Sequence, residues 1–125
     1  MRWTRRLWTM LAGVNGLVAV AAGAFSAHGL SDPRAAEVMR TGATYEMTHA
    51  LATLACAALV GAAPRMRVAP AFFLAGAVLF SGSLYALALG APRWVGVVTP
   101  FGGLSFLAGW VVVAWAAMEL DRPRA

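Results

Sequence analysis

The side chains most suited to chemistry in this chain lie inside an otherwise apolar segment. Glu46 and His49 stand three residues apart there, and Thr53 and Cys56 follow at helical spacing. At about 100° per residue, these four positions fall within one face of a helix and form a polar stripe. An ionisable group in such a segment is costly to bury and usually meets a partner or a water-filled cavity. The candidate polar cluster consists of His28, Tyr45, Glu46, His49 and Thr53.

Two interpretations of this cluster remain open. A carboxylate with two imidazoles could bind a divalent metal or pass protons, because imidazole titrates near neutral pH. Under this interpretation, we expect His28, at the end of the preceding apolar segment, to lie at the same level in the membrane as His49. In the other interpretation, Glu46 and His49 satisfy each other and the capping N–H groups near the helix start, and so hold a short surface helix against the bundle. We favour this structural interpretation, because two histidines and one carboxylate are few ligands for a metal. We therefore predict no metal and no cofactor. Haem held between the two histidines is a third alternative.

A second set of polar residues lies in the other apolar segments. Ser81 and Tyr85 share a helix face at four-residue spacing, and Thr99 precedes a proline in an arrangement typical of a helix start. Hydroxyls in membrane helices commonly hydrogen-bond across or back along helices. The candidate packing and hydrogen-bonding residues are Asn15, Ser81, Ser83, Tyr85 and Thr99. The sequence has no nucleophile with a base and acid, no phosphate-binding glycine loop and no dinucleotide fingerprint, so we predict no enzymatic activity.

Four apolar segments, each about twenty residues long, must position these side chains. At about 1.5 Å per residue, each would reach about 30 Å, the thickness of a bilayer's hydrocarbon core. Hydrophobic residues make up 61% of the 125 residues and charged residues only 12%, which is too little polar surface for a soluble globule. We therefore predict an all-α membrane protein, a single integral membrane domain over residues 1–125 that forms an antiparallel bundle of four transmembrane helices. The predicted spans cover about 7–27, 44–63, 70–90 and 98–118.

The first segment also has features of a secretory signal peptide. Arginines precede it, and Ala24 and Ser26 are small residues near a cleavage point. We favour a span, because the apolar run exceeds the roughly 7–15 residues of a signal core and Asn15 interrupts it.

The arginines that flank the predicted spans indicate an orientation. Seven lie on one side, namely Arg2, Arg5, Arg6, Arg65, Arg67, Arg122 and Arg124, and three on the other, namely Arg34, Arg40 and Arg93. The positive-inside rule therefore predicts a multi-pass membrane protein with both termini in the cytoplasm. The net charge of +5 is spread over termini and connectors, which favours anionic lipid headgroups over nucleic acid. The bilayer is the predicted partner, and a second copy of the chain or another membrane protein are further candidates.

The connector between the first two spans is the longest. Asp32 offers a helix cap, Pro33 suits a first helical position, and charged residues alternate with apolar ones as far as Arg40. We predict a short interfacial helix over about 32–41, which Gly42 ends or bends before the second span begins. The alternative is one long helix from Pro33 to Ala63 with the glycine inside it.

Helices in lipid associate by close packing, and small residues mark where they approach. The third segment has Gly82, Ala86 and Gly90 at four-residue spacing, and the fourth has Gly109. Phe101-Gly102-Gly103, inside the fourth segment, is typical of a backbone contact point. We expect these small residues to line the helix interfaces.

Several strings in the chain together resemble one family. They are Gly23-Ala-Phe-Ser-Ala-His-Gly-Leu30, Thr44-Tyr45-Glu46 leading to His49-Ala50-Leu51, Phe80-Ser-Gly-Ser-Leu-Tyr85, and Thr99-Pro-Phe-Gly-Gly103 followed by Gly109-Trp110. The chain resembles the YgdD-like family of small bacterial inner-membrane proteins, also called domain of unknown function 423, over nearly its whole length. The resemblance implies four spans and a membrane location, and it implies no established activity. One departure is Ser26, where the family pattern has glycine.

Two functions remain open after this resemblance. We predict a small inner-membrane protein with a non-enzymatic role, as a structural or regulatory partner in the envelope. The alternative is a small transporter or channel in which Glu46 and His49 couple the movement of protons or cations.

Overall fold

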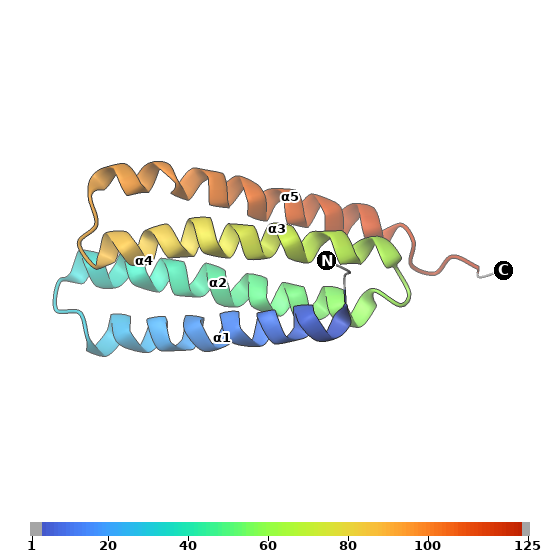
Figure 1. Ribbon diagram of the computed structural model, residues 1–125, viewed down its shortest axis with the longest axis horizontal. Coiled ribbons are helices and arrows are strands. Elements are labelled where there is room, and N and C mark those ends of the chain that lie inside the picture. Colours follow the sequence, from blue (N-terminus) through green and yellow to red (C-terminus); the bar gives the residue numbers. More distant parts are fainter. Residues whose placement is uncertain (1–3, 124–125) are drawn as a thin grey trace.

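The computed structural model describes residues 4–123, and over that range the secondary structure is helical (Figure 1). The helices form four rods that run alternately up and down, and both described ends of the chain lie at the same end of the molecule (Figure 1). The first rod is α1 (Arg5–His28) and the second is α2 (Pro33–Leu59). The third rod comprises η1 (Pro64–Val68), α3 (Ala69–Gly76), η2 (Ala77–Ser81) and α4 (Gly82–Ala88), and the fourth comprises η3 (Arg93–Val97) and α5 (Thr99–Ala117). Arg2 and Arg124, used above for the orientation, lie outside the described residues.

Each rod packs against the next one along the chain, so α1 and α5 lie at opposite edges (Figure 1). Three helical segments are long and apolar enough to cross a membrane, namely Arg5–His28, Pro64–Ala88 and Arg93–Ala117. They correspond to the first, third and fourth predicted spans. The second rod, α2, does not meet this measure because polar residues stand in its middle. It lies between two of the apolar segments and has eleven buried residues, against three in α1.

The connector after the first span differs from the prediction. The predicted interfacial helix over 32–41 is wrong, because α2 is one continuous helix from Pro33 to Leu59. The helix starts as predicted, since the Asp32 side chain accepts a hydrogen bond from the Arg34 backbone N–H at 3.2 Å. Gly42 does not end the helix, because a glycine inside a helix costs only about 1 kcal/mol. The alternative of one long helix was correct in kind, although the helix ends before Ala63.

The third and fourth rods interlock through glycine and phenylalanine. A Cβ atom added to Gly109 would collide with the Phe73 ring, and one added to Gly76 would collide with the Phe106 ring. A Cβ on Gly102 would meet the backbone of Phe80, so the two main chains approach closely there. The predicted contact point at Gly102 and the predicted use of Gly109 are thus confirmed.

Gly82 and Gly90 of the third predicted span do not line a close helix interface, contrary to the prediction. A Cβ atom on Gly82 or Gly90 would meet nothing within 4 Å, because these residues do not face another rod. Gly90 instead forms the turn after α4, where its φ of 102° suits glycine. The small residues that matter in the third rod are those that lie opposite an aromatic ring.

Candidate functional site

His49 has both ring nitrogens engaged within the protein. The residue is 4% exposed, Nδ1 lies 2.6 Å from the Tyr45 carbonyl oxygen, and Nε2 lies 3.0 Å from Nε1 of Trp110. An indole N–H can only donate and a carbonyl can only accept. Nε2 therefore accepts from Trp110, and Nδ1 carries the proton and donates it to Tyr45. The imidazole is thus held as one neutral tautomer, with no free lone pair for a metal.

Aromatic rings enclose this imidazole. The Phe106 ring stacks on it, with 3.6 Å between ring centroids and 9° between planes. Phe73 and Trp110 lie at 5.3 and 5.8 Å in tilted and edge-on orientations. The Phe106 ring fits here because Gly76 has no side chain. The interlock between the third and fourth rods thus builds the apolar wall around His49.

Glu46 has a partner on a different rod. The residue is 6% exposed, and its Oε1 accepts a hydrogen bond from the Tyr85 hydroxyl at 2.7 Å. One turn away, the fully buried Ser81 hydroxyl donates to the Gly42 carbonyl oxygen at 2.7 Å. A Cβ on Gly42 would come within 2.8 Å of the Tyr85 ring. Glycine at this position therefore lets the ring pass over α2, so that the phenol reaches the carboxyl group.

Glu46 and His49 are not each other's partners, contrary to the structural interpretation of the sequence. Residues three apart on a helix differ by about 60° in direction. This difference is enough for Glu46 to face α4 while His49 faces α5. Each group is satisfied by a different rod, and α2 is joined to both.

The remaining members of the predicted polar cluster have separate positions. Thr53 donates back along α2 to the His49 carbonyl oxygen at 2.9 Å. The Tyr45 ring packs on Phe80 at 4.7 Å, and 45% of the residue is exposed. His28 is exposed at the end of α1, where Gly23 already faces Ala43. His28 therefore lies toward the far end of the rods and does not join His49, so the predicted common level of the two histidines is wrong.

Most of the predicted packing and hydrogen-bonding residues form hydrogen bonds between two rods. Ser81 and Tyr85 contact α2 as described, and the Ser83 and Thr99 hydroxyls lie 2.6 Å apart between the third and fourth rods. The Thr99 side chain thus does not cap α5, although the helix begins at this residue. Asn15 does not join them, because its side-chain amide donates to the Leu11 carbonyl oxygen on its own helix at 3.0 Å.

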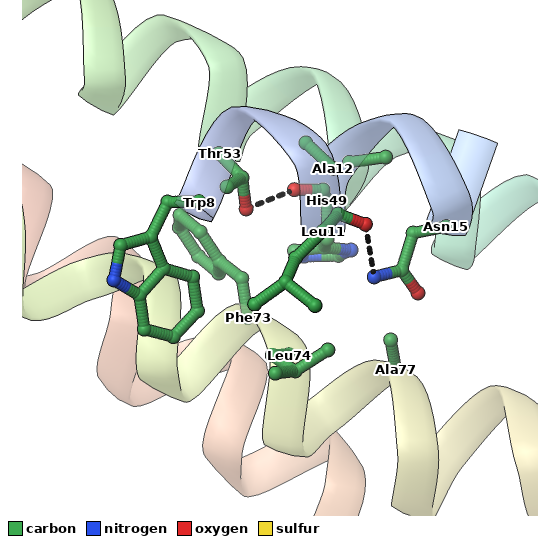
Figure 2. A pocket seen from close by; sticks show the side chains of 10 residues that line it. Trp8, Leu11, Ala12, Asn15, His49, Thr53, Phe73, Leu74 and Ala77 are labelled. Carbon is green, nitrogen blue, oxygen red and sulfur yellow. Dashed lines mark hydrogen bonds between the residues drawn. The ribbon is translucent and has the colours of Figure 1, made fainter. Parts of the chain in front are cut away.

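Asn15 lines a small cavity between α1, α2 and α3. Figure 2 shows its amide on one side and His49 and Thr53 on another, with Trp8 and Phe73 closing the space. The cavity has a volume of about 10 Å³, which is about the room that one water molecule needs. A wider groove of about 850 Å³ lies between α2 and α5, where Tyr45, Phe80 and Trp110 form part of its wall.

Sequence reasoning missed three features of this site. Trp110 was not assigned to His49, although an indole N–H inside an apolar segment needs an acceptor and so signals one. Gly42 was assigned to a helix end rather than to a helix contact. The π-helical segment η2, which ends at Ser81, has no signal in the sequence. Such segments occur frequently at functional sites.

The part of the chain that the structure describes does not bring together the ligands that the metal interpretation requires. Among the described residues, no group of three or more histidine, cysteine, aspartate or glutamate side chains could hold a metal ion. Haem between His28 and His49 is excluded by geometry, because the two residues lie apart and both His49 nitrogens are engaged.

These features define an all-helical membrane protein with a buried network of hydrogen bonds. The model of the family described as "Protein of unknown function (DUF423)" matches residues 22–103. The chain is 42% identical to the UPF0382 inner membrane protein YgdD of Escherichia coli K12, with 95% of each chain covered. It is 36% identical to the UPF0382 membrane protein YwdK of Bacillus subtilis 168, with 91% of this chain and 98% of that one covered.

A UPF0382 membrane protein of Haemophilus influenzae is 40% identical, with 87% of this chain and 91% of that one covered. No solved structure matches the chain. The chain therefore belongs to the DUF423 family, and the predicted resemblance is confirmed.

Proposed function

We propose that this protein is a non-catalytic, four-span component of the inner membrane, which acts as a structural or regulatory partner of other envelope proteins. The buried polar residues of α2 then serve to hold the four rods in one arrangement. The observation that carries this proposal is the closed hydrogen bonding of His49, whose two nitrogens are both used inside the protein. A group that binds a transported ion or catalyses a reaction needs a free lone pair or proton, and this imidazole offers neither.

The proposal includes α2 as the fourth span. At about 1.5 Å per residue, its 27 residues reach about 40 Å, which is longer than the hydrocarbon core. Its ionisable residues Glu46 and His49 are buried against neighbouring rods, as membrane proteins require. Four spans would put both termini on one side, and the arginine asymmetry favours the cytoplasm.

Reporter fusions test this topology directly. We expect fusions of a cytoplasmic reporter to be active at both termini, and a periplasmic reporter to be active when inserted near Leu30. Reporters that place the two termini on opposite sides would overturn the four-span arrangement.

The second candidate function is that of a small transporter or channel in which Glu46 and His49 couple the movement of protons or cations. One observation favours it, because Oε2 of the buried Glu46 has no hydrogen bond to any residue in 4–123. A buried carboxyl group with a free oxygen is able to bind a proton.

A pair of variants at one position separates these functions. Glutamine retains an acceptor for the Tyr85 hydroxyl but cannot ionise, whereas alanine removes both properties. If the role is structural, Glu46→Gln keeps near wild-type thermal stability in detergent and Glu46→Ala loses it. In liposomes that contain a pH-sensitive dye, we expect no proton or cation flux above that of empty vesicles. Flux that is present with the wild type and abolished by Glu46→Gln would establish transport instead.

A further inference from the structure

A cleft with three charged residues in its lining lies at the end of the molecule opposite the described chain ends. It has a volume of about 440 Å³ and lies between the start of α2 and the turn that joins α4 to η3. Arg34 lines it from α2, and Arg93 lines it from the start of η3. Asp32 is the acidic residue in the lining.

The backbone on both sides of the cleft is defined by helix ends. After α4, the Ala91 N–H donates to the Ala86 carbonyl oxygen at 2.9 Å, and the Gly90 N–H donates to that of Leu87 at 3.2 Å. With Gly90 at φ 102°, this is the Schellman arrangement that ends a helix. The turn brings Arg93 to the first position of η3. On the other side, Asp32 caps α2 two residues before Arg34.

The cleft lies where the apolar rods end. One apolar segment stops at Ala88 and the next starts at Arg93, and the turn between them forms one wall of the cleft. Residues at such an end stand at the level of the lipid headgroups. This placement does not depend on the function proposed for Glu46 and His49.

The charges of the cleft are incompletely balanced. The ion pair that the structure records among the described residues is Arg65 with Glu119, at the opposite end. Neither Arg34 nor Arg93 has an acidic partner within residues 4–123. The carboxylate of Asp32 accepts from a backbone N–H, and one carboxylate against two guanidinium groups leaves a net positive charge.

The distribution of arginines makes this cleft unusual for its end of the molecule. Five arginines lie at the end that carries the described chain ends, namely Arg5, Arg6, Arg65, Arg67 and Arg122. The other arginines within residues 4–123 are Arg34, Arg40 and Arg93 at the opposite end, and two of these three line one cleft from two separate segments. Guanidinium groups bind phosphate through two parallel hydrogen bonds, so two of them facing one cleft suit a phosphate group.

We propose that this cleft binds the phosphate group of a membrane phospholipid, held between Arg34 and Arg93. The lipid's acyl chains then continue along the apolar surface of the rods. Since the cleft is open and its arginines are exposed, binding weakens as salt screens the charges.

Lipid titration of the full-length protein in detergent tests the site. Phosphatidylglycerol is added and bound lipid is counted by native mass spectrometry. We expect the dissociation constant for phosphatidylglycerol to be about tenfold higher in the double variant Arg34→Gln/Arg93→Gln than in the wild type. Arg40→Gln removes a charge from α2 outside the cleft and is the matched control, expected to bind as the wild type does. All three proteins should unfold at similar temperatures, because the substituted side chains are exposed and glutamine suits helices.

Two further measurements identify the ligand. Asp32→Asn keeps the cap but removes the negative charge, so it should bind phosphatidylglycerol more tightly. Inorganic phosphate should fail to displace the lipid at millimolar concentration. If it does displace the lipid, the ligand is a free anion and the assignment to lipid is overturned. Equal lipid binding by the wild type and the double variant would overturn the site itself.

Discussion

The two faces of the third rod join their neighbours in different ways. Toward α2, this rod presents hydroxyl groups, and Ser81 and Tyr85 each donate one hydrogen bond. Toward the fourth rod, it presents glycine and phenylalanine in close contact, with Gly102 against the backbone of Phe80. The face toward the fourth rod also has two hydrogen bonds, Ser83 with Thr99 and Ser105 with the Phe72 carbonyl oxygen. What distinguishes this face is the close fit of glycine and phenylalanine, which the face toward α2 lacks along most of its length.

This difference follows from the surroundings of the rods. Lipid is as apolar as the side chains it surrounds, so helices gain little by burying apolar surface and must associate through packing or hydrogen bonds. Close packing adds many small dispersion contacts over a long interface, whereas a buried hydrogen bond fixes direction at one point. The glycine face should therefore respond most to added volume, and the hydroxyl face to the loss of a partner.

The largest effect is expected from added volume at Gly102. In Gly102→Ala the new methyl group meets the main chain of Phe80, which cannot rotate away as a side chain can. We expect a loss of about 1–3 kcal/mol in the free energy of unfolding, the usual cost of overpacking, as measured by titration with a denaturing detergent. Gly82→Ala is the matched control on the third rod, where a methyl group meets nothing within 4 Å. Equal losses in the two variants would show that shape does not distinguish this face.

A smaller effect is expected from the loss of a hydrogen bond on the α2 face. Tyr85→Phe leaves the buried Glu46 without the one hydrogen bond that its side chain makes among the described residues. An unsatisfied buried group costs about 1–3 kcal/mol in proteins, but bonds in membranes average only about 0.6 kcal/mol, so we expect about 1 kcal/mol. Tyr45→Phe is the control, because the Tyr45 hydroxyl makes no hydrogen bond to any residue in 4–123 and the residue is 45% exposed. A wild-type stability for Tyr85→Phe would mean that this bond does not hold α2.

The two faces were not equally predictable from the sequence. The apolar segments and the contact at Gly102 follow from composition and spacing, because a glycine pair inside a membrane helix has few other uses. The partners of Glu46 and His49 do not follow, because a direction on a helix surface has no meaning until the neighbouring helices are placed. Gly42 was misjudged for the same reason. A glycine that admits the Tyr85 ring and one that ends a helix look alike in the sequence.

The hydrogen bond from Trp110 to His49, which joins α2 to the fourth rod, is expected to have a comparable or slightly smaller effect. Trp110→Phe removes the indole N–H that Nε2 of His49 accepts, but the ring stacking with Phe106 remains. We expect a loss of about 0.5–1 kcal/mol. In ¹⁵N NMR spectra of the wild type, His49 should show the tautomer with the proton on Nδ1. Trp94→Phe, on an exposed indole, should leave stability unchanged, and the opposite His49 tautomer would contradict the assigned bond to Trp110.

The smallest effect is expected where a hydrogen bond lies on the packed face. The Ser105 hydroxyl donates to the Phe72 carbonyl oxygen at 2.8 Å across the third and fourth rods, at an exposed position. Ser105→Ala leaves this carbonyl inside a helix, where backbone bonding continues, and the glycine and phenylalanine contacts remain. We therefore expect a loss of less than about 0.5 kcal/mol, within the low range for membrane hydrogen bonds. A loss as large as that of Tyr85→Phe would mean that directional bonds also hold the fourth rod, and the contrast between the two faces would disappear.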